Sequence, residues 1–214
     1  SVRFGLGEKV LSETFGNEKK GLIPNTKWKK NNLGKGWVIG ETLITGIGQG
    51  YTQTTPLQLC QMTAQLANGG FKIYPKIIVD ENSKSVEDIR VIMNENRQQL
   101  NNKDNKIQNP SELLNFLNKK EHEPLFKSSN NINLIREAMF ASTNEVRGTS
   151  YASRIDDPKY QFAGKTGTSQ VKRITKLDRE LDLKTFEIPY NERDHALYIA
   201  FGPYKNPRYS LSIV

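Results

Sequence analysis

The sequence predicts an α+β fold in which helices flank an antiparallel sheet. Apolar residues recur at helical spacing in two stretches, at about 56–67 and 132–144. Three predicted strands follow, at about 160–171, 196–201 and 209–214. The last two strands are joined by Gly-Pro-Tyr-Lys-Asn-Pro, which is typical of a tight turn. We therefore expect three strands in an antiparallel meander, covered by the two helices.

The first 51 residues are rich in glycine and carry no clear helical or strand periodicity. Trp28 and Trp37 nevertheless indicate a packed segment, because large aromatic side chains bury much of their surface in folded proteins. We therefore expect this segment to be ordered but irregular.

The first helix has recognisable start and stop signals. Thr54 or Thr55 can cap it, and Pro56 suits its first turn, where a backbone N–H would lack a partner. The Asn-Gly-Gly run at 68–70 would end it. Its apolar face consists of Leu59, Met62 and Leu66. Cys60, the only cysteine, would then be a small core residue rather than a reactive thiol.

Two further elements are predicted between this helix and the meander. Residues 71–79 predict a short strand, although Pro75 interrupts it. A second helix is predicted from about Ile132 to Asn144, because apolar residues repeat there at helical spacing, and Arg-Gly-Thr at 147–149 would end it.

A change in composition indicates a polar insertion at about 81–131. Ten asparagines occur between positions 94 and 131, together with many lysines and glutamines. Such a stretch buries little apolar surface, so we expect a surface insertion that the fold does not need. One short helix is predicted within it, at 111–118, and His122 would be a solvated surface residue.

Composition narrows the classes of function. The chain has 214 residues, enough for one domain with a core, but a mean hydropathy of −0.64 makes it a polar one. No apolar run approaches the ~18 residues that a membrane helix needs. One cysteine and two distant histidines give no metal-ligand spacing, so no metal is expected. The net charge of +8 comes from basic residues interleaved with acidic ones, which indicates a solvated surface and no nucleic-acid partner.

The clearest candidate for a functional site is the stretch 162–171, Phe-Ala-Gly-Lys-Thr-Gly-Thr-Ser-Gln-Val. On a strand, Lys165 offers a fixed positive charge, and Thr166 and Thr168 offer hydroxyl donors. Gly167 removes a side chain that would block close backbone approach. If the strand is an edge, its free N–H and C=O groups can pair with an extended peptide. Together these groups would hold a short peptide by its terminal carboxylate, and such a charge-assisted hydrogen bond contributes roughly 1.5–3 kcal/mol.

Lys-Thr-Gly is one of three signatures of the penicillin-recognising serine enzymes, and its neighbours strengthen the resemblance. Three blocks resemble class B penicillin-binding proteins: Gly-Ile-Gly-Gln-Gly-Tyr at 46–51, Thr-Pro-Leu-Gln at 55–58 and Ala-Asn-Gly-Gly at 67–70. The order of the later elements is also similar, with Gly148-Thr149 leaving a helix, then the Lys-Thr-Gly-Thr strand, then a strand entered through 193–196. Blocks 21–28 and 37–42 resemble the elongation-type subfamily, penicillin-binding protein 2.

The resemblance implies a partial β-lactamase/transpeptidase-like fold, with residues 1–214 forming the C-terminal part of a penicillin-binding transpeptidase domain. It implies that Lys165 and Thr166 bind the carboxylate of a substrate's terminal D-alanine or of a β-lactam. Gly167 would let the substrate lie against the strand. Thr168 would donate its backbone N–H to the oxyanion hole, and losing one such donor typically costs about 2.7–4 kcal/mol of transition-state stabilisation.

The nucleophile of this family lies in a Ser-x-x-Lys motif at the start of a helix, before the 46–51 block, so we expect this chain not to contain it. One Ser-x-x-Lys does occur, at 169–172. It continues the predicted strand, where residues three apart point to opposite faces, so its serine and lysine would not meet. Ser-x-Asn matches at 128–131 and 142–144 fall after the 46–51 block and are out of family order.

Three other functional motifs are each incomplete in this sequence: a P-loop, a dinucleotide-binding motif and a catalytic triad. The stretch 164–166 resembles the end of a P-loop, but Lys159 stands where the leading glycine is needed. The 46–51 block ends in tyrosine where a dinucleotide-binding motif needs glycine, and we expect a tight glycine turn there instead. Residues 193–195 are expected to form a charged loop, because His195 has no serine partner for a catalytic triad.

The resemblance implies that the whole protein is a serine-type D,D-transpeptidase that cross-links peptidoglycan stem peptides ending in D-Ala-D-Ala, binds β-lactams, and needs no cofactor. It also implies a place at the periplasmic face of the bacterial inner membrane, with an anchor upstream of this chain. The implied partners are a membrane glycosyltransferase and other elongation-complex proteins. This chain alone would be inactive.

A second hypothesis is a non-catalytic penicillin-recognising binding or sensor module, which keeps the carboxylate cradle without turnover. A Ser-x-x-Lys at a helix start and a following Ser-x-Asn in the full gene would favour the enzyme over the sensor.

Overall fold

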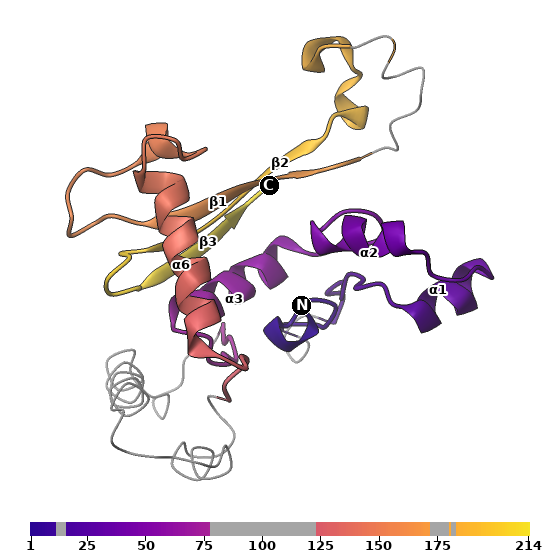
Figure 1. Ribbon diagram of the computed structural model, residues 1–214, viewed down its shortest axis with the longest axis horizontal. Coiled ribbons are helices and arrows are strands. Elements are labelled where there is room, and N and C mark those ends of the chain that lie inside the picture. The colour runs from indigo at the N-terminus through magenta and orange to yellow at the C-terminus, as the bar shows by residue number, and fades with distance from the viewer. Residues whose placement is uncertain (12–15, 78–122, 172–179, 181–182) are drawn as a thin grey trace.

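The computed structural model describes residues 1–11, 16–77, 123–171, 180 and 183–214. Three strands, β1 (Ala163–Ser169), β2 (His195–Gly202) and β3 (Tyr209–Ile213), pair in the order β1-β2-β3, and both pairings are antiparallel. The predicted meander is therefore confirmed, and Figure 1 shows it as a twisted sheet. β1 is three residues shorter at its start than the sequence predicts, because Tyr160 belongs to the preceding turn.

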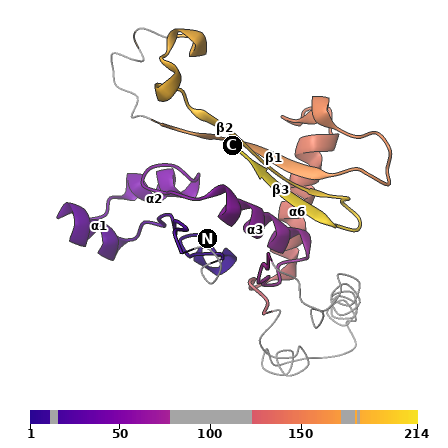
Figure 2. The ribbon, with the colours of Figure 1, turned by 180° about the vertical axis from the view of Figure 1, so that it is seen from behind.

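Two helices cover this sheet, α3 (Pro56–Ala67) and α6 (Ser129–Asn144). α6 packs against β1, while α3 packs against β3 and β2 (Figures 1 and 2). Both helices contribute to one buried cluster, which consists of Leu66, Ala67, Ile132, Met139, Ala163 and Phe201. The α+β class with helices on an antiparallel sheet is thus confirmed, and the cluster fixes where β1 lies relative to α6.

The start of α3 uses the cap that the sequence predicts. Thr55 Oγ1 accepts a hydrogen bond from the Gln58 N–H at 3.2 Å, and Gln58 Oε1 accepts one from the Thr55 N–H at 3.0 Å. This reciprocal pair satisfies two backbone donors that a helix start otherwise leaves open. Cys60 lies half-buried farther along α3, with its Sγ 3.6 Å from the Ser210 carbonyl oxygen and 3.3 Å from Ser210 Oγ.

Two glutamines inside α3 tie the N-terminal segment to the helix. Gln58 is fully buried, and its Nε2 donates to the carbonyl oxygens of Glu8 at 2.6 Å and Lys20 at 2.8 Å. Gln65 is buried as well, and its Nε2 donates to the Phe4 carbonyl at 3.0 Å. The sequence analysis missed both roles, because a glutamine at a buried helical position cannot be distinguished from a solvated one without its partners.

The expectation of an irregular segment over residues 1–51 is wrong in part. Residues Thr26–Leu33 form α1 and residues Ile39–Gly46 form α2, and both extend away from the sheet beyond α3 (Figures 1 and 2). Asn25 caps α1 by accepting from the Trp28 N–H at 2.9 Å, and Gly34 ends it with a φ of +64°. The cap residues can be recognised in the sequence, but an eight-residue helix is too short for its apolar residues to show a reliable helical periodicity.

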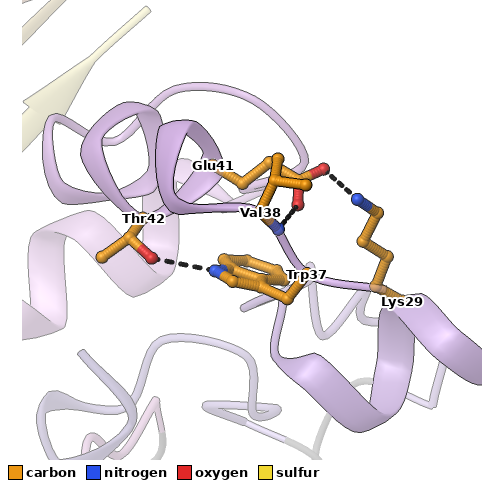
Figure 3. Close-up of polar contacts among 5 residues, drawn as sticks. All are labelled: Lys29, Trp37, Val38, Glu41 and Thr42. Carbon is orange, nitrogen blue, oxygen red and sulfur yellow. Dashed lines mark hydrogen bonds and ion pairs between the residues drawn. The ribbon is translucent and has the colours of Figure 1, made fainter. Parts of the chain in front are cut away.

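The junction between α1 and α2 is held by polar contacts around Glu41 (Figure 3). Lys29 of α1 forms an ion pair with the Glu41 carboxylate, which also accepts from the Val38 N–H at 2.9 Å. Trp37 Nε1 donates to Thr42 Oγ1 at 2.9 Å. The Lys29 contact first, and the Val38 N–H second, lower the pKa of the Glu41 carboxyl below its ordinary value of 4.5.

The predicted strand at 71–79 is wrong for the residues that the structure describes. Phe71 forms a single antiparallel bridge with Pro124, and residues 72–77 form no strand. Side chains satisfy part of this backbone instead: Asn68 Oδ1 accepts from the Phe71 N–H at 2.9 Å, and Gln65 Oε1 accepts from the Ile73 N–H at 3.1 Å. Pro75 has no N–H with which to pair with a neighbouring strand, which agrees with the expectation that it interrupts the strand.

Residues 123–131, which the sequence assigns to the polar insertion, contact the core. The Leu125 N–H donates to the Gly70 carbonyl at 2.8 Å, and the Leu125 side chain is 5% exposed. Phe126 packs edge-on against Phe71, with ring centroids 5.7 Å apart. The rest of the expected insertion, residues 81–122, lies outside the described residues, and so do the predicted helix at 111–118 and His122.

Four single-turn 3₁₀ helices complete the described elements: η1 (Val2–Phe4), η2 (Tyr151–Ser153), η3 (Thr185–Glu187) and η4 (Tyr190–Glu192). In the ranges that the structure describes, no helix has both the length and the apolar character to cross a bilayer.

Candidate functional site

The Lys-Thr-Gly-Thr motif lies on β1, as the sequence predicts. Within the described sheet β1 pairs only with β2, so its other side is an edge. Ala163 and Gly164, at the start of the strand, are buried against the helices, whereas the strand from Lys165 onward is half-buried or exposed. The motif thus occupies the part of β1 that an extended ligand can reach.

The two glycines of β1 have different surroundings. A Cβ placed on Gly164 would lie 2.2 Å from the hydroxyl oxygen of Tyr198, so the protein needs glycine there to seat the tyrosine ring. A Cβ placed on Gly167 would meet only Leu197, at an ordinary contact distance of 3.5 Å. Packing within the described protein therefore gives no reason for glycine at 167, and its face is open to a ligand.

Lys165 lies beside Thr166 and donates hydrogen bonds to it. Its Nζ donates to the Thr166 carbonyl oxygen at 2.7 Å and to Thr166 Oγ1 at 3.3 Å. No carboxylate of the residues that the structure describes forms an ion pair with this exposed ammonium group. A positive charge beside a hydroxyl, on an open strand edge, is suited to an incoming carboxylate.

A row of hydroxyl groups connects Thr166 to the end of α6. Thr166 Oγ1 lies 3.2 Å from Thr149 Oγ1, and Thr149 Oγ1 lies 3.2 Å from Ser142 Oγ, in the last turn of α6. The connection after α6 turns sharply to bring Thr149 there, with the Ser150 N–H donating to the Ser142 carbonyl at 3.0 Å. Gly148 permits this approach, because a Cβ there would lie 2.3 Å from the Ser142 carbonyl oxygen.

A second hydroxyl cluster lies behind this row and is buried. Tyr198, which pairs with Thr166 across the strands, donates its hydroxyl proton to Ser150 Oγ at 3.2 Å. Ser150 Oγ donates to the Ser142 carbonyl at 3.0 Å, and Thr143 Oγ1 lies 3.3 Å from Ser150 Oγ. Thr143 and Ser150 are 0% and 7% exposed. This cluster fixes the β1–β2 pair against α6 beside the motif.

Among the predicted site residues, the structure brings Lys165 and Thr166 together and places Gly167 beside them on the open part of the strand. Thr168 lies farther along β1, exposed and opposite Ala196. Ser169 is the last residue of β1 and lies opposite His195, so the serine of the Ser-x-x-Lys match is a strand residue. Lys172, the lysine of that match, lies outside the described residues.

The other candidate motifs have structural roles in the described chain. Residues 46–51 form a tight turn after α2, with a φ of +76° at Gly48 and +78° at Gly50, as expected. Asn144, from one Ser-x-Asn match, donates from Nδ2 to the carbonyls of Phe140 and Phe162. Asp194 accepts from the Val171 N–H at 3.2 Å at the entry to β2. The charged-loop prediction therefore holds for 193–194, whereas His195 is already the first residue of β2.

The sequence analysis missed Ser142, Ser150 and Tyr198 as neighbours of the motif. Thr149 was noticed only as part of a helix exit. Tyr198 reaches the motif through the β1–β2 register, which a connection of more than twenty residues does not reveal. A signal did exist in the cluster of small hydroxyl residues around the end of the second helix, at 142, 143, 149 and 150.

Comparison with known proteins gives matches along nearly the whole chain. Residues 2–214 match the family described as penicillin binding protein transpeptidase domain. The chain is 32% identical over 213 residues to the peptidoglycan D,D-transpeptidase MrdA of Salmonella typhimurium, and 31% identical over 212 residues to that of Acinetobacter baumannii. These matches cover 99% of this chain but 29% and 26% of the relatives, so the chain spans less than a third of their length.

Two solved structures have a similar fold. The crystal structure of Pseudomonas aeruginosa PBP2 in complex with WCK 5153 matches with a TM-score of 0.61 and 30% identity, over 99% of this chain and 36% of that one. The complex between PBP2 and MreC from Helicobacter pylori matches with a TM-score of 0.64 and 26% identity, over 99% of this chain and 30% of the PBP2 chain. Both likenesses extend over nearly all of this chain.

Proposed function

The chain belongs to the penicillin-binding-protein transpeptidase domain family, and from this premise we propose that it forms the carboxylate-binding part of a peptidoglycan D,D-transpeptidase. The observation that carries the proposal is the open edge of β1, where the Lys165 ammonium group has no acidic partner among the residues that the structure describes and lies beside a hydroxyl and an unhindered glycine. We propose that residues 1–214 are the C-terminal part of the transpeptidase domain.

The substrate in this proposal is a stem peptide ending in D-Ala-D-Ala. Lys165 and Thr166 bind its terminal carboxylate, and Gly167 lets its backbone lie against β1. A β-lactam carries a carboxylate as well and takes the same place.

The reaction is an acyl transfer through a serine ester. The serine oxygen attacks the penultimate D-alanine carbonyl, the bond to the terminal D-alanine breaks, and that residue leaves as the free amine. An amine of a neighbouring stem then attacks the ester, forms the cross-link and returns the serine. The Thr168 N–H is one donor to the oxyanion, worth about 2.7–4 kcal/mol in comparable sites.

We place the nucleophile in a part of the protein outside these 214 residues. The chain offers one Ser-x-x-Lys match, at 169–172, and its serine lies on β1 rather than at a helix start. Incubation of the 214-residue chain alone with benzylpenicillin is therefore expected to give no covalent adduct in intact mass spectrometry.

Location and partners follow from the same proposal. The protein acts at the periplasmic face of the inner membrane, held by an anchor outside this chain. The Helicobacter pylori relative was solved in complex with MreC, so a partner of that kind is proposed here too, together with a membrane glycosyltransferase and other elongation-complex proteins.

The test is acylation of the protein that contains this chain by a fluorescent penicillin. Lys165→Ala is expected to lower the second-order rate constant about ten- to a hundredfold, because the charge opposite the carboxylate is lost while the backbone donors remain. Lys205→Ala, at an exposed lysine in the β2–β3 turn, is the matched control and should acylate like the parent.

Equal rates for Lys165→Ala and the parent would make Lys165 an ordinary surface lysine. Acylation of the parent without any cross-linking of stem peptides would favour the alternative, a non-catalytic penicillin-recognising sensor.

A further inference from the structure

We propose that Thr149 is a positioning residue that orients the Thr166 hydroxyl so that its proton points to the substrate carboxylate. The inference rests on the proposed function and adds to it a residue that does not touch substrate itself. It starts from the row of hydroxyls Ser142, Thr149 and Thr166, in which successive oxygens lie 3.2 Å apart.

The direction of the hydrogen bonds in this row follows from what each group can donate. A carboxylate only accepts, and the Lys165 ammonium only donates. The Thr166 hydroxyl has one proton, so when it donates to a carboxylate it can only accept from its other neighbours. Lys165 Nζ, at 3.3 Å, can be one donor to Thr166 Oγ1, and Thr149 Oγ1 must then be the other.

Thr149 in turn has one proton, and the contact to Thr166 uses it. Its oxygen then accepts from Ser142 Oγ, so every proton in the row points toward the ligand. Without the Thr149 hydroxyl, water can take its place at this exposed position and accept the Thr166 proton, so part of the bound population would lose one hydrogen bond to the carboxylate.

The fold holds Thr149 in place for this role. Ser142 belongs to the last turn of α6, and the Ser150 N–H and Oγ both donate to its carbonyl oxygen at 3.0 Å. The hydroxyls of the buried Thr143 and the half-buried Tyr198 brace Ser150 from behind. Thr149 therefore lies between a helix end and β1, and a β-branched side chain has few rotamers to choose from.

The experiment measures acylation of the protein that contains this chain by benzylpenicillin and by its methyl ester, which has the same scaffold without the carboxylate. Intact mass spectrometry gives the second-order rate constant for each. Thr149→Val keeps the shape of the side chain and removes the hydroxyl. It is expected to lower the rate with the acid about three- to tenfold and the rate with the ester by a clearly smaller factor, because the ester carbonyl is an uncharged and weaker acceptor. Thr149→Ser restores the hydroxyl and should restore the rate with the acid.

A purely structural role for Thr149 would lower both rates by the same factor, and this outcome would overturn the proposal. Unchanged rates with both probes would overturn it as well. Ser142→Ala serves as the second variant if Thr149→Val does not fold. Ser142→Ala should lower the rate with the acid by less than Thr149→Val does. If Ser142→Ala lowers no rate, the proposed order of hydroxyl protons is wrong.

The experiment distinguishes a failure of the proposed function from a failure of this inference. If the parent protein is not acylated by benzylpenicillin at all, both fall. If the parent is acylated and Lys165→Ala slows it, while Thr149→Val acylates at the parent rate, only the inference about Thr149 is lost.

Discussion

Gly164 and Gly167 lie three residues apart on β1, yet the protein lacks a side chain at each for a different reason. Gly164 faces the Tyr198 ring, whose hydroxyl is held by Ser150. Gly167 faces open space apart from an ordinary contact with Leu197. The first glycine therefore serves the fold, whereas we propose that the second leaves room for a ligand.

Matched alanine substitutions separate these roles. Gly164→Ala should lower the free energy of unfolding by about 1–3 kcal/mol, because the added methyl displaces a rigid ring from a packed position. Gly167→Ala should leave stability unchanged, and should lower acylation by a fluorescent penicillin on the order of tenfold, because small displacements of a bound reactant are costly. Thermal unfolding and acylation are measured on both variants. A loss of stability at 167 comparable to that at 164 would remove the argument for an open face.

Gln58 ties the N-terminal segment to α3 through two hydrogen bonds. Gln58→Leu should destabilise the protein by roughly 1–3 kcal/mol, because the buried amide would no longer donate to the Glu8 and Lys20 carbonyls and each such hydrogen bond contributes about 0.5–1.5 kcal/mol. Gln53→Leu, at an exposed position nearby, is the control and should change little. Denaturant unfolding of the two variants decides the matter, and equal midpoints would show that water replaces the lost donors.

At the level of residues, the sequence predicts the Lys-Thr-Gly motif but not the side chains that pack around it. Lys165, Thr166 and Gly167 were found because their residue types and order are themselves the signal. Tyr198 was missed because it reaches Thr166 only through strand register.

The α1–α2 junction is an element whose stability depends on pH. Glu41 has a pKa below 4.5 in the folded protein because of Lys29 and the Val38 N–H, whereas an unfolded chain gives it an ordinary value. A lowered pKa means that the folded state favours the charged carboxylate. Its stabilising effect is therefore fully present above about pH 4.5 and is lost as the pH falls through the folded-state pKa.

Glu41→Gln tests this contribution. The variant should unfold at a lower temperature than the parent at pH 7, and the difference should shrink as the pH is lowered through and below 4.5. Comparing the two proteins at each pH cancels the titration of all other groups. A difference that stays constant with pH would mean that the Lys29–Glu41 ion pair does not stabilise the junction.

Elements with strong local signals were predictable, and those without them were not. α3 was predicted with its cap, because threonine followed by proline at 55–56 is typical of a helix start. The meander followed from three predicted strands and the turn residues at 202–207. The strand at 71–79 failed because the composition of Phe71 to Ile77 suits a strand, while the neighbouring Asn68 and Gln65 take over its backbone donors.

At the scale of the whole molecule, a backbone hydrogen bond between Lys72 and Glu123 shows how short the connection between these two residues could be made. The Lys72 N–H donates to the Glu123 carbonyl at 2.8 Å, so the chain leaves the core and returns to it at neighbouring points. Ile77, five residues beyond Lys72, lies at most about 18 Å from it. Ten Gly/Ser residues span up to about 35 Å and can therefore replace residues 78–122.

The protein with this replacement should unfold at the same temperature as the parent or a higher one, because a shorter connection costs less closure entropy. Leu125→Ala is the contrasting variant. It should destabilise by about 2–5 kcal/mol, since Leu125 is buried in the core. A marked fall in unfolding temperature after the replacement would show that residues 78–122 contribute to the fold, against the expectation from composition.

Cys60 gives this chain a chemical reporter of how firmly α3 is attached to the sheet. Its thiol is the only one in the 214 residues, and it lies against Ser210 of β3. The half-buried thiol reacts with a maleimide faster when α3 and β3 separate, so the increase in alkylation rate over that of the closed state measures how often the contact opens. If the rate rises steeply with denaturant, opening exposes much surface and α3 detaches only when the domain unfolds. If it hardly changes, α3 lifts locally while β1 and its motif stay in place.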